Sequence, residues 1–309
     1  AGDPGALVAC AFPDRIAQRR DEPGSFRFAG GGGARLPPTD KLARAKLLAV
    51  AGVQVGTAAQ IRLAAPLDPE ALPAALTARV SEQVETAFDP VSGAVLARRR
   101  RRLGALVLSD ATAPAEPGEA DAALAAALAG PAWDKLPWSD AARQVQARVA
   151  LMRRLEPEAG WPDLSDETLR AGVADWLAPH LAGLRRLADL AKLDLAAVLR
   201  AALPRGLAGR LDRALPGHVA LKRGQAPVDY TAPVPTAAAR AQAFYGMTAT
   251  PLLADGRVKL SLALLSPAGR PVAITPDLGQ FWRTGWAELR KEMRGRYPKH
   301  DWPERPDLA

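Results

Sequence analysis

The hydrophobic periodicity of the 309-residue chain changes along its length, and this change limits the folds that it can adopt. Apolar residues alternate in short segments through the first third, as in strands, and recur every three or four positions from Ser139 to Leu215, as in helices. Strand-like segments return after Gly217, and a last helix begins near Pro276. The pattern predicts several units of different class, in line with a soft prior of about 100–200 residues per domain.

We expect an α+β multidomain fold whose first part is a small β-barrel. A glycine-rich turn, Gly30–Gly33, and a helical interval at residues 68–81 separate short strands. The strand-like segments are Phe26–Phe28, Lys46–Val55, Ala59–Ala65 and Gly93–Leu108. Several short strands around one helix are typical of a small, partly open barrel, and the OB-fold is the commonest such fold.

Proline and glycine positions divide the chain into four regions. Residues 1–112 should form the OB-like nucleic-acid-binding domain, and residues 113–136 a linker with a short alanine-rich helix. Residues 137–216 should form a helical bundle, and residues 217–309 a mixed α/β unit that includes a helix over Thr236–Tyr245.

Composition favours a soluble protein with anionic partners. The formal net charge is +8, which favours nucleic acid first and acidic membranes second. The single cysteine, Cys10, excludes an internal disulfide, and we expect it to be buried. No apolar stretch is long enough to span a membrane, and the chain starts with neither a signal peptide nor methionine. We expect a cytoplasmic chain that is a fragment of a longer one.

Five consecutive arginines interrupt the strand pattern at Arg98–Arg102. Successive side chains of a strand point to opposite faces, so these arginines require an edge strand or a sheet that is open on both faces. Such a run suits a phosphate backbone, because each phosphate that is neutralised releases counterions. The alternative is an edge strand that charge protects from aggregation.

The C-terminal stretch Pro276–Pro306 predicts an amphipathic helix followed by a stiff tail. Asp277 can cap the helix, and Pro298 prevents it from continuing beyond Tyr297. The apolar stripe consists of Leu278, Trp282, Trp286, Leu289 and Met293. From Phe281 to Lys299, six basic residues oppose two acidic ones, which indicates a docking or polyanion-binding element. The alternative is a helix that seals a core and keeps its arginines solvated.

Catalytic motifs are absent from the sequence. It has neither the phosphate loop G-x-x-x-x-G-K-[ST] nor a DExH tetrad, so we expect no ATP hydrolysis by this chain alone. The three histidines His180, His218 and His300 do not have the spacing of metal ligands, and no motif selects a hydrolytic dyad.

Several motifs resemble a known family. Arg296-Tyr297-Pro298-Lys299-His300 followed by Trp302-Pro303-Glu304, with Phe281-Trp282 and Leu264-Leu265-Ser266-Pro267 upstream, resembles the end of the bacterial HrpB-type ATP-dependent helicases. That family is a branch of the DEAH/RHA RNA helicases. The chain departs from the family pattern at Gly269 and Trp286, where glutamine and tyrosine are commoner; neither change alters a charge.

The resemblance implies an OB-like domain that follows a helicase motor and closes over a single strand. Ala11–Ala17 and Ala59–Leu67 carry the likeness to that domain, and Leu136–Ser139 and Ser165–Glu167 are similar to the family's C-terminal extension. The implied partners are single-stranded RNA or DNA and the motor domains, and ATP and Mg²⁺ would belong to the motor. The candidate nucleic-acid-binding residues are Arg98, Arg99, Arg100, Arg101, Arg102, Arg15 and Arg19.

The C-terminal helix and tail supply a candidate surface for a protein partner. Its residues are Arg283, Arg290, Arg294, Arg296, Tyr297, Lys299, His300 and Trp302. Three functional hypotheses follow: an RNA-binding accessory module of a helicase, a scaffold that braces the motor or recruits a protein without touching nucleic acid, and an independent enzyme. A deep pocket with converging carboxylates would favour the third.

Overall fold

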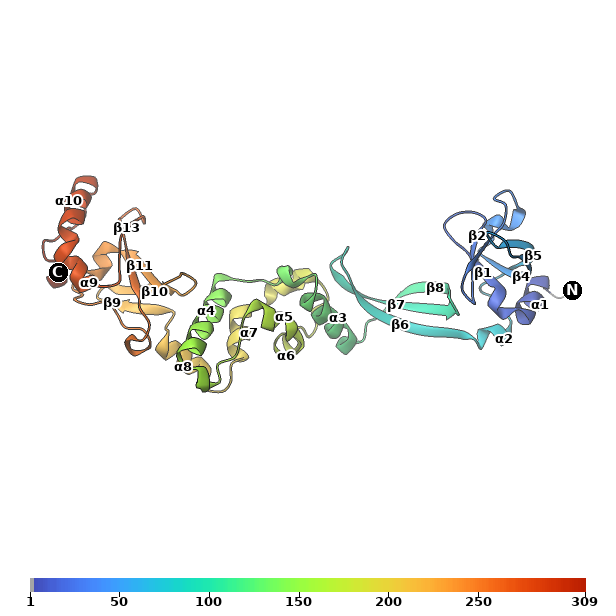
Figure 1. Ribbon diagram of the computed structural model, residues 1–309, viewed down its shortest axis with the longest axis horizontal. Coiled ribbons are helices and arrows are strands. Elements are labelled where there is room, and N and C mark those ends of the chain that lie inside the picture. The colour runs from blue at the N-terminus through green and yellow to red at the C-terminus, as the bar shows by residue number, and fades with distance from the viewer. Residues whose placement is uncertain (1–2) are drawn as a thin grey trace. The chain divides into compact units, whose positions relative to one another are not determined.

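The computed structural model describes residues 3–309. These residues form two compact units, one that ends at Leu124 and one that covers Ala125–Ala309. The predicted fold class is confirmed: a small β-barrel is followed by helices and then by a mixed α/β unit (Figure 1). Among the described residues no helix is both long and apolar enough to cross a membrane.

The first unit begins with helix α1 (Pro4–Ala11) and a closed five-stranded barrel of order β1-β2-β3-β5-β4. The strands are β1 (Ile16–Arg19), β2 (Ser25–Phe28), β3 (Gly33–Arg35), β4 (Leu47–Gln54) and β5 (Gln60–Leu67). Alternation buries Ala17, Phe26 and Leu48 inside the barrel, while Ile16 and Leu47 pack in a second cluster that includes residues of α1. Cys10 is exposed, which corrects the expectation of burial, because it lies on the outward side of α1.

The second part of this unit is a separate three-stranded antiparallel sheet, β6 (Val80–Asp89), β7 (Ala94–Leu103) and β8 (Leu106–Ala113). The single strand expected at residues 93–108 is a hairpin, because Gly104 adopts a φ of +56° and turns the chain. Helix α2 covers only Ala74–Thr77 of the expected helical interval. The arginine run therefore lies outside the barrel, on the central strand, and the edge-strand alternative is wrong.

Helix α3 (Pro117–Ala129) contains the boundary between the units, and five further helices of the second unit follow. They are α4 (Asp140–Leu155), α5 (Asp166–Ala171), α6 (Val173–Trp176), α7 (Leu195–Ala201) and α8 (Leu207–Ala214). Ser139 and Ser165 cap α4 and α5, because each side chain accepts a hydrogen bond from a backbone amide of the first turn. After α4, the carboxylate of Glu156 accepts hydrogen bonds from Trp161 and Arg257 and pairs with Arg210 at 2.9 Å.

The chain ends in a five-stranded sheet of order β13-β12-β11-β10-β9 and two helices. The elements are β9 (His218–Leu221), β10 (Gly224–Asp229), β11 (Thr236–Arg240), β12 (Ser261–Leu265), β13 (Pro271–Thr275), α9 (Leu278–Thr284) and α10 (Trp286–Arg296). The helix expected over Thr236–Tyr245 is wrong, because its first half is β11, which pairs with β10 and β12. The cross-strand pairing overrides the helical preference of its alanines.

Helices α9 and α10 bury the predicted apolar stripe, and Asp277 caps α9 by accepting a hydrogen bond from the amide of Gln280. Trp286, at the start of α10, is 1% exposed and lies edge-on to both Trp282 and Tyr245. The alternative reading, a helix that seals a core, therefore holds for this face of the helices.

Candidate nucleic-acid interface

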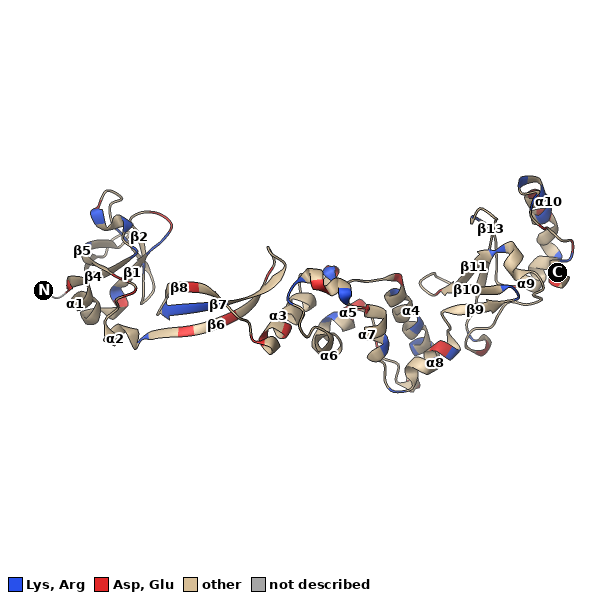
Figure 2. Cartoon of the chain, turned by 180° about the vertical axis from the view of Figure 1, so that it is seen from behind, with Lys and Arg blue, Asp and Glu red and all other residues tan. Residues whose placement is uncertain are grey.

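The arginine run lies on β7 between two strands that carry acidic residues (Figure 2). Because side chains alternate along a strand, Arg98, Arg100 and Arg102 share one face, and Arg99 and Arg101 share the other. The sheet is open enough that all five arginines are exposed or half-buried. The requirement for two accessible faces is met by a central strand of a thin sheet.

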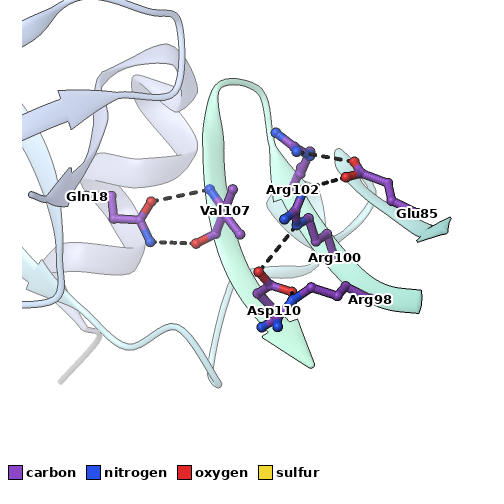
Figure 3. A network of polar contacts seen from close by, with 7 residues as sticks. All are labelled: Gln18, Glu85, Arg98, Arg100, Arg102, Val107 and Asp110. Atoms are coloured by element: carbon purple, nitrogen blue, oxygen red, sulfur yellow. Dashed lines mark hydrogen bonds and ion pairs between the residues drawn. The ribbon is translucent and has the colours of Figure 1, made fainter. Parts of the chain in front are cut away.

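Three arginines of one face bind two carboxylates (Figure 3). Asp110 on β8 accepts hydrogen bonds from Nε of Arg98 at 2.7 Å and from Nε of Arg100 at 3.3 Å. Glu85 on β6 accepts from Nη1 of Arg100 and, at 3.3 Å, from Nη2 of Arg102. Arg100 thus connects the two carboxylates across the width of the sheet.

These contacts neutralise most of the charge of the run. The hydrogen bond from Arg98 to Asp110 lowers the pKa of this carboxyl, and the hydrogen bond to Asp110 raises the pKa of Arg100. On the opposite face Arg99 pairs with Glu82 at 3.4 Å, whereas Arg101 has no ion pair among the described residues. Five guanidinium groups and three carboxylates leave an excess of two positive charges.

A phosphate that binds this sheet would therefore find guanidinium groups whose N–H donors already bind carboxylates. The side chains of Arg100 and Arg102 are 30% and 34% exposed, and their carboxylate partners lie beside them. Arg101 is the one arginine of the run that could bind a phosphate without displacing a carboxylate of the described chain.

The β7–β8 turn holds the sheet against the barrel. Gln18 of β1 donates from Nε2 to the carbonyl of Val107 at 2.6 Å and accepts from its amide at 3.2 Å (Figure 3). The amide of Ala105 donates to the carbonyl of Ala29, and Leu103 packs in the cluster beneath α1. These contacts join strands that are far apart in sequence, so the barrel and the sheet share a core.

Arg15 and Arg19, the other predicted nucleic-acid-binding residues, lie at the two ends of β1 and not beside the run. Arg15 lies over the ring of Phe12, with its guanidinium carbon 5.1 Å from the ring centroid. Arg19 donates from Nη1 to the carbonyl of Arg44 at 2.9 Å. Neither of these contacts involves an arginine of β7.

Sequence reasoning missed a set of arginines on the outer surface of the barrel. Arg35 of β3 pairs with Ser25 of β2 and with Gln60 of β5, so these three side chains point to the same side of the barrel wall. Side chains two positions apart on a strand share a side, so Arg27 and Arg62 point outward together with Arg35. All three arginines are exposed, and Arg27 and Arg35 have no ion pair among residues 3–309. The available signal was the alternation of single arginines with buried Phe26, Ala34 and Ile61.

The predicted C-terminal interaction surface is partly internal. Trp302 is 5% exposed, lies 6.1 Å from Trp286 between ring centroids, and donates from Nε1 to the carbonyl of Tyr297 at 3.0 Å. Arg290 donates from Nε to the carbonyl of Trp302 at 2.8 Å and pairs with Glu304. Trp302 is therefore corrected to a structural contact, whereas Arg290 is half-buried and also bound by these neighbours. The other members of the predicted surface are half-buried or exposed: Arg283, Arg294, Arg296, Tyr297, Lys299 and His300.

The third hypothesis, an independent enzyme, would need a metal cluster or converging carboxylates among the described residues. Within the described part of the chain no three His, Cys, Asp or Glu side chains are grouped to hold a metal ion. A pocket of about 670 Å³ between α4, α7 and the β9–β11 strands is lined by Arg148, Arg200, His218 and a single carboxylate, Asp229. Because Asp229 is the single carboxylate in its lining, this pocket has no pair of converging carboxylates. The oxygen Oδ1 of Asp229 accepts a hydrogen bond from Gln144 at 2.7 Å.

Two family models match the chain. Residues 79–111, the three-stranded sheet with the arginine run, match the connector region of the ATP-dependent RNA helicase HrpB. Residues 176–306 match the ATP-dependent helicase C-terminal family.

Whole-chain comparisons give the same family. The chain is 37% identical over 306 residues to the ATP-dependent RNA helicase HrpB of Escherichia coli (strain K12), covering 97% of this chain and 38% of that protein. It also resembles two crystal structures of E. coli HrpB, described as a DExH-box NTPase and as a DEAH/RHA helicase. The first has a TM-score of 0.62 and 35% identity over 99% of this chain, the second 0.55 and 33% over 96%, and each match covers 38% of the solved chain.

Proposed function

We infer that the chain, which matches the connector region and the C-terminal domain of the HrpB-type ATP-dependent helicases, corresponds to the C-terminal portion of such a helicase. From this premise we propose that it is the accessory half of an ATP-dependent RNA helicase, which binds single-stranded nucleic acid and supports the motor. The chain spans 38% of the length of its curated relative. ATP and Mg²⁺ belong, in this proposal, to the motor, because the chain has neither a phosphate loop nor a DExH tetrad.

The observation that carries the proposal is the basic outer surface of the barrel. Residues 3–67 contain nine Lys or Arg and five Asp or Glu, an excess of four positive charges. Arg27, Arg35 and Arg62 lie on neighbouring strands of one outer face, and this face of five-stranded OB-type barrels is the one that binds oligonucleotides. Unpaired guanidinium groups there can each bind a phosphate without giving up a carboxylate.

The test is a salt-dependent titration of the full chain with fluorescent single-stranded RNA. The double variant Arg27→Glu with Arg35→Glu should weaken binding by about tenfold or more at low salt, and should lower the slope of log K against log[salt] by about 1.4, since each lost contact with a single strand removes about 0.7. The matched control, Arg283→Glu with Arg294→Glu, makes the same charge change on the second unit. An equal loss of RNA affinity in the two double variants, or an affinity that does not change with salt concentration, would refute the proposal.

A scaffold function is the second candidate, and the ion pairs of β7 favour it. Arg98, Arg100 and Arg102 are occupied by carboxylates of neighbouring strands, so their first role in this sheet is structural. If the sheet is a brace, Arg100→Met should leave RNA affinity unchanged and should accelerate amide hydrogen exchange in β6–β8. Loss of RNA affinity in Arg101→Gln would instead assign phosphate contact to the run.

A further inference from the structure

The strand β13 is an edge strand of the C-terminal sheet. It pairs with β12 on one side, and the described residues place no strand on its other side. Its sequence after Pro271 is Val-Ala-Ile-Thr, without a charge, and Ile274 is 68% exposed. Pro271 and the register shift between Leu264 and Leu265 interrupt pairing at the start of β13. The rest of the strand, Val272–Thr275, carries no charge, and free N–H and C=O groups of an edge strand pair readily with another chain.

A groove of about 720 Å³ runs beside this edge. Val272 and Ala273 of β13 line one side, and Phe281 of α9 and Leu289 of α10 supply apolar surface on the other. From the start of α10 onward the lining residues are Gly285, Glu288, Leu289, Lys291, Glu292 and Gly295. Gly285, Glu288, Glu292 and Gly295 follow one another at spacings of three or four residues, so they lie on one side of the helix. Gly285 and Gly295 add no side chain to this face of the helix, so they do not fill the groove.

The groove side of α10 carries two carboxylates and one lysine. Glu288 and Glu292 are exposed, lie four residues apart on the groove side, and have no ion pair among residues 3–309. Lys291 also lines the groove, which leaves an excess of one negative charge, whereas Arg290 and Arg294 lie on the neighbouring face of the helix. Two like charges at this spacing repel each other, and a cation placed between them would relieve that repulsion.

We propose that β13 and this groove form a docking site for an extended peptide segment of a partner protein, in which aliphatic residues alternate with Lys or Arg. The peptide pairs with the free edge of β13 as an added strand. Its side chains on the helix side enter the groove, where the aliphatic ones contact Phe281 and Leu289 and the basic ones approach Glu288 and Glu292. Main-chain hydrogen bonds give affinity, and the groove gives specificity for charge.

The test uses the full chain and a set of fluorescein-labelled octapeptides that alternate Val or Ile with Lys. Anisotropy should show saturable binding by such peptides. Replacing every Lys of the best peptide by Glu should weaken it by about tenfold or more, and so should N-methylation of alternate backbone nitrogens, which removes strand pairing. On binding, amide hydrogen exchange at Val272–Ile274 should slow.

Variants of the chain locate the site. Ile274→Lys places a charge on the edge and should weaken peptide binding by about tenfold, whereas Leu252→Lys, at a position that is 76% exposed elsewhere in the unit, should not. Glu288→Gln with Glu292→Gln should abolish the preference for Lys over Glu peptides. Tryptophan fluorescence checks that each variant is folded.

Three results would overturn the proposal. The first is no binding by any alternating peptide up to about 1 mM. The second is an equal loss of peptide affinity in the Ile274→Lys and Leu252→Lys variants. The third is dimerisation of the free chain that Ile274→Lys abolishes, which would assign the edge to a second copy of the chain.

Discussion

Asp212 joins three helices of the second unit, and its replacement should have a measurable cost. Oδ1 of this α8 residue accepts from Nη2 of Arg148 on α4 at 2.6 Å, and Oδ2 accepts from Nη2 of Arg200 on α7 at 2.6 Å. The side chain of Arg148 is 8% exposed, whereas that of Asp212 is 48% exposed. Asp212→Asn would leave a buried guanidinium without its anionic partner.

The magnitude follows from the pKa and from exposure. The hydrogen bond from Arg200 is the largest influence, and it lowers the pKa of Asp212 from 3.8 to about 2. This shift corresponds to about 2.4 kcal/mol, which screening of the half-exposed carboxylate reduces to about 1.2 kcal/mol. The unpaired charge of Arg148 adds about 1 kcal/mol. We expect Asp212→Asn to lower the free energy of unfolding by about 2 kcal/mol at pH 7.

The pH dependence has a definite sign. Because the folded-state pKa of Asp212 is depressed, its stabilisation is fully present above the unfolded value of 3.8 and is lost as the pH falls through about 2. The difference in stability between the parent chain and Asp212→Asn should therefore be constant from pH 7 to about 5 and should narrow between pH 4 and 2.

Urea unfolding followed by tryptophan fluorescence is a selective assay for this unit. All seven tryptophans lie between Trp133 and Trp302, so the first unit contributes no signal. With a slope of about 2 kcal/mol per M urea, the midpoint of Asp212→Asn should fall by about 1 M. The control is Asp175→Asn, an exposed carboxylate without an ion pair in the described chain. A shift below about 0.25 M, or an equal shift in the control, would refute the reasoning.

Two further predictions concern single polar side chains. Glu156→Gln should lower the free energy of unfolding of the second unit by about 1–2 kcal/mol in the same assay. Burial opposes its ionisation, but hydrogen bonds and nearby arginines outweigh it and lower the pKa of Glu156, so its stabilisation should fade in acid. Gln18→Ala removes both hydrogen bonds to Val107 and should speed amide exchange at Val107 and Ala105, whereas Gln83→Ala on exposed β6 should not; unchanged protection at Val107 would contradict the docking of the sheet through Gln18.

Most of the barrel was predictable because β2, β4 and β5 each carry their own signal, whereas β1 was not predicted as a strand. Phe26 and Phe28 alternate with polar residues, and a glycine-rich turn follows them. Strand β6 gave no comparable signal, because its residues are exposed or only half-buried and no apolar alternation is required of them. In β11 the alanines favour a helix locally, and only pairing with strands from distant parts of the chain makes them a strand.

The candidate site was predictable only in part. The run Arg98–Arg102 is visible in the sequence, but its neutralisation depends on the register that places Glu85 opposite Arg98 and Asp110 opposite Arg100. A hairpin register is set by its turns, and a single glycine such as Gly104 within a strand-like segment does not by itself predict a turn. The arginines of the barrel face come from three strands and form a set only after the barrel closes.

The pairing of the arginine run changes which surface should dominate contact with a polyanion. A phosphate that approaches Arg100 must compete with Glu85 and Asp110, whose negative charges also repel it, and that competition offsets part of each new contact. At Arg27 or Arg35 no such competitor is present among the described residues, so each counterion released counts in full. The barrel face should therefore set affinity and salt slope, and the run should add only its two residual charges.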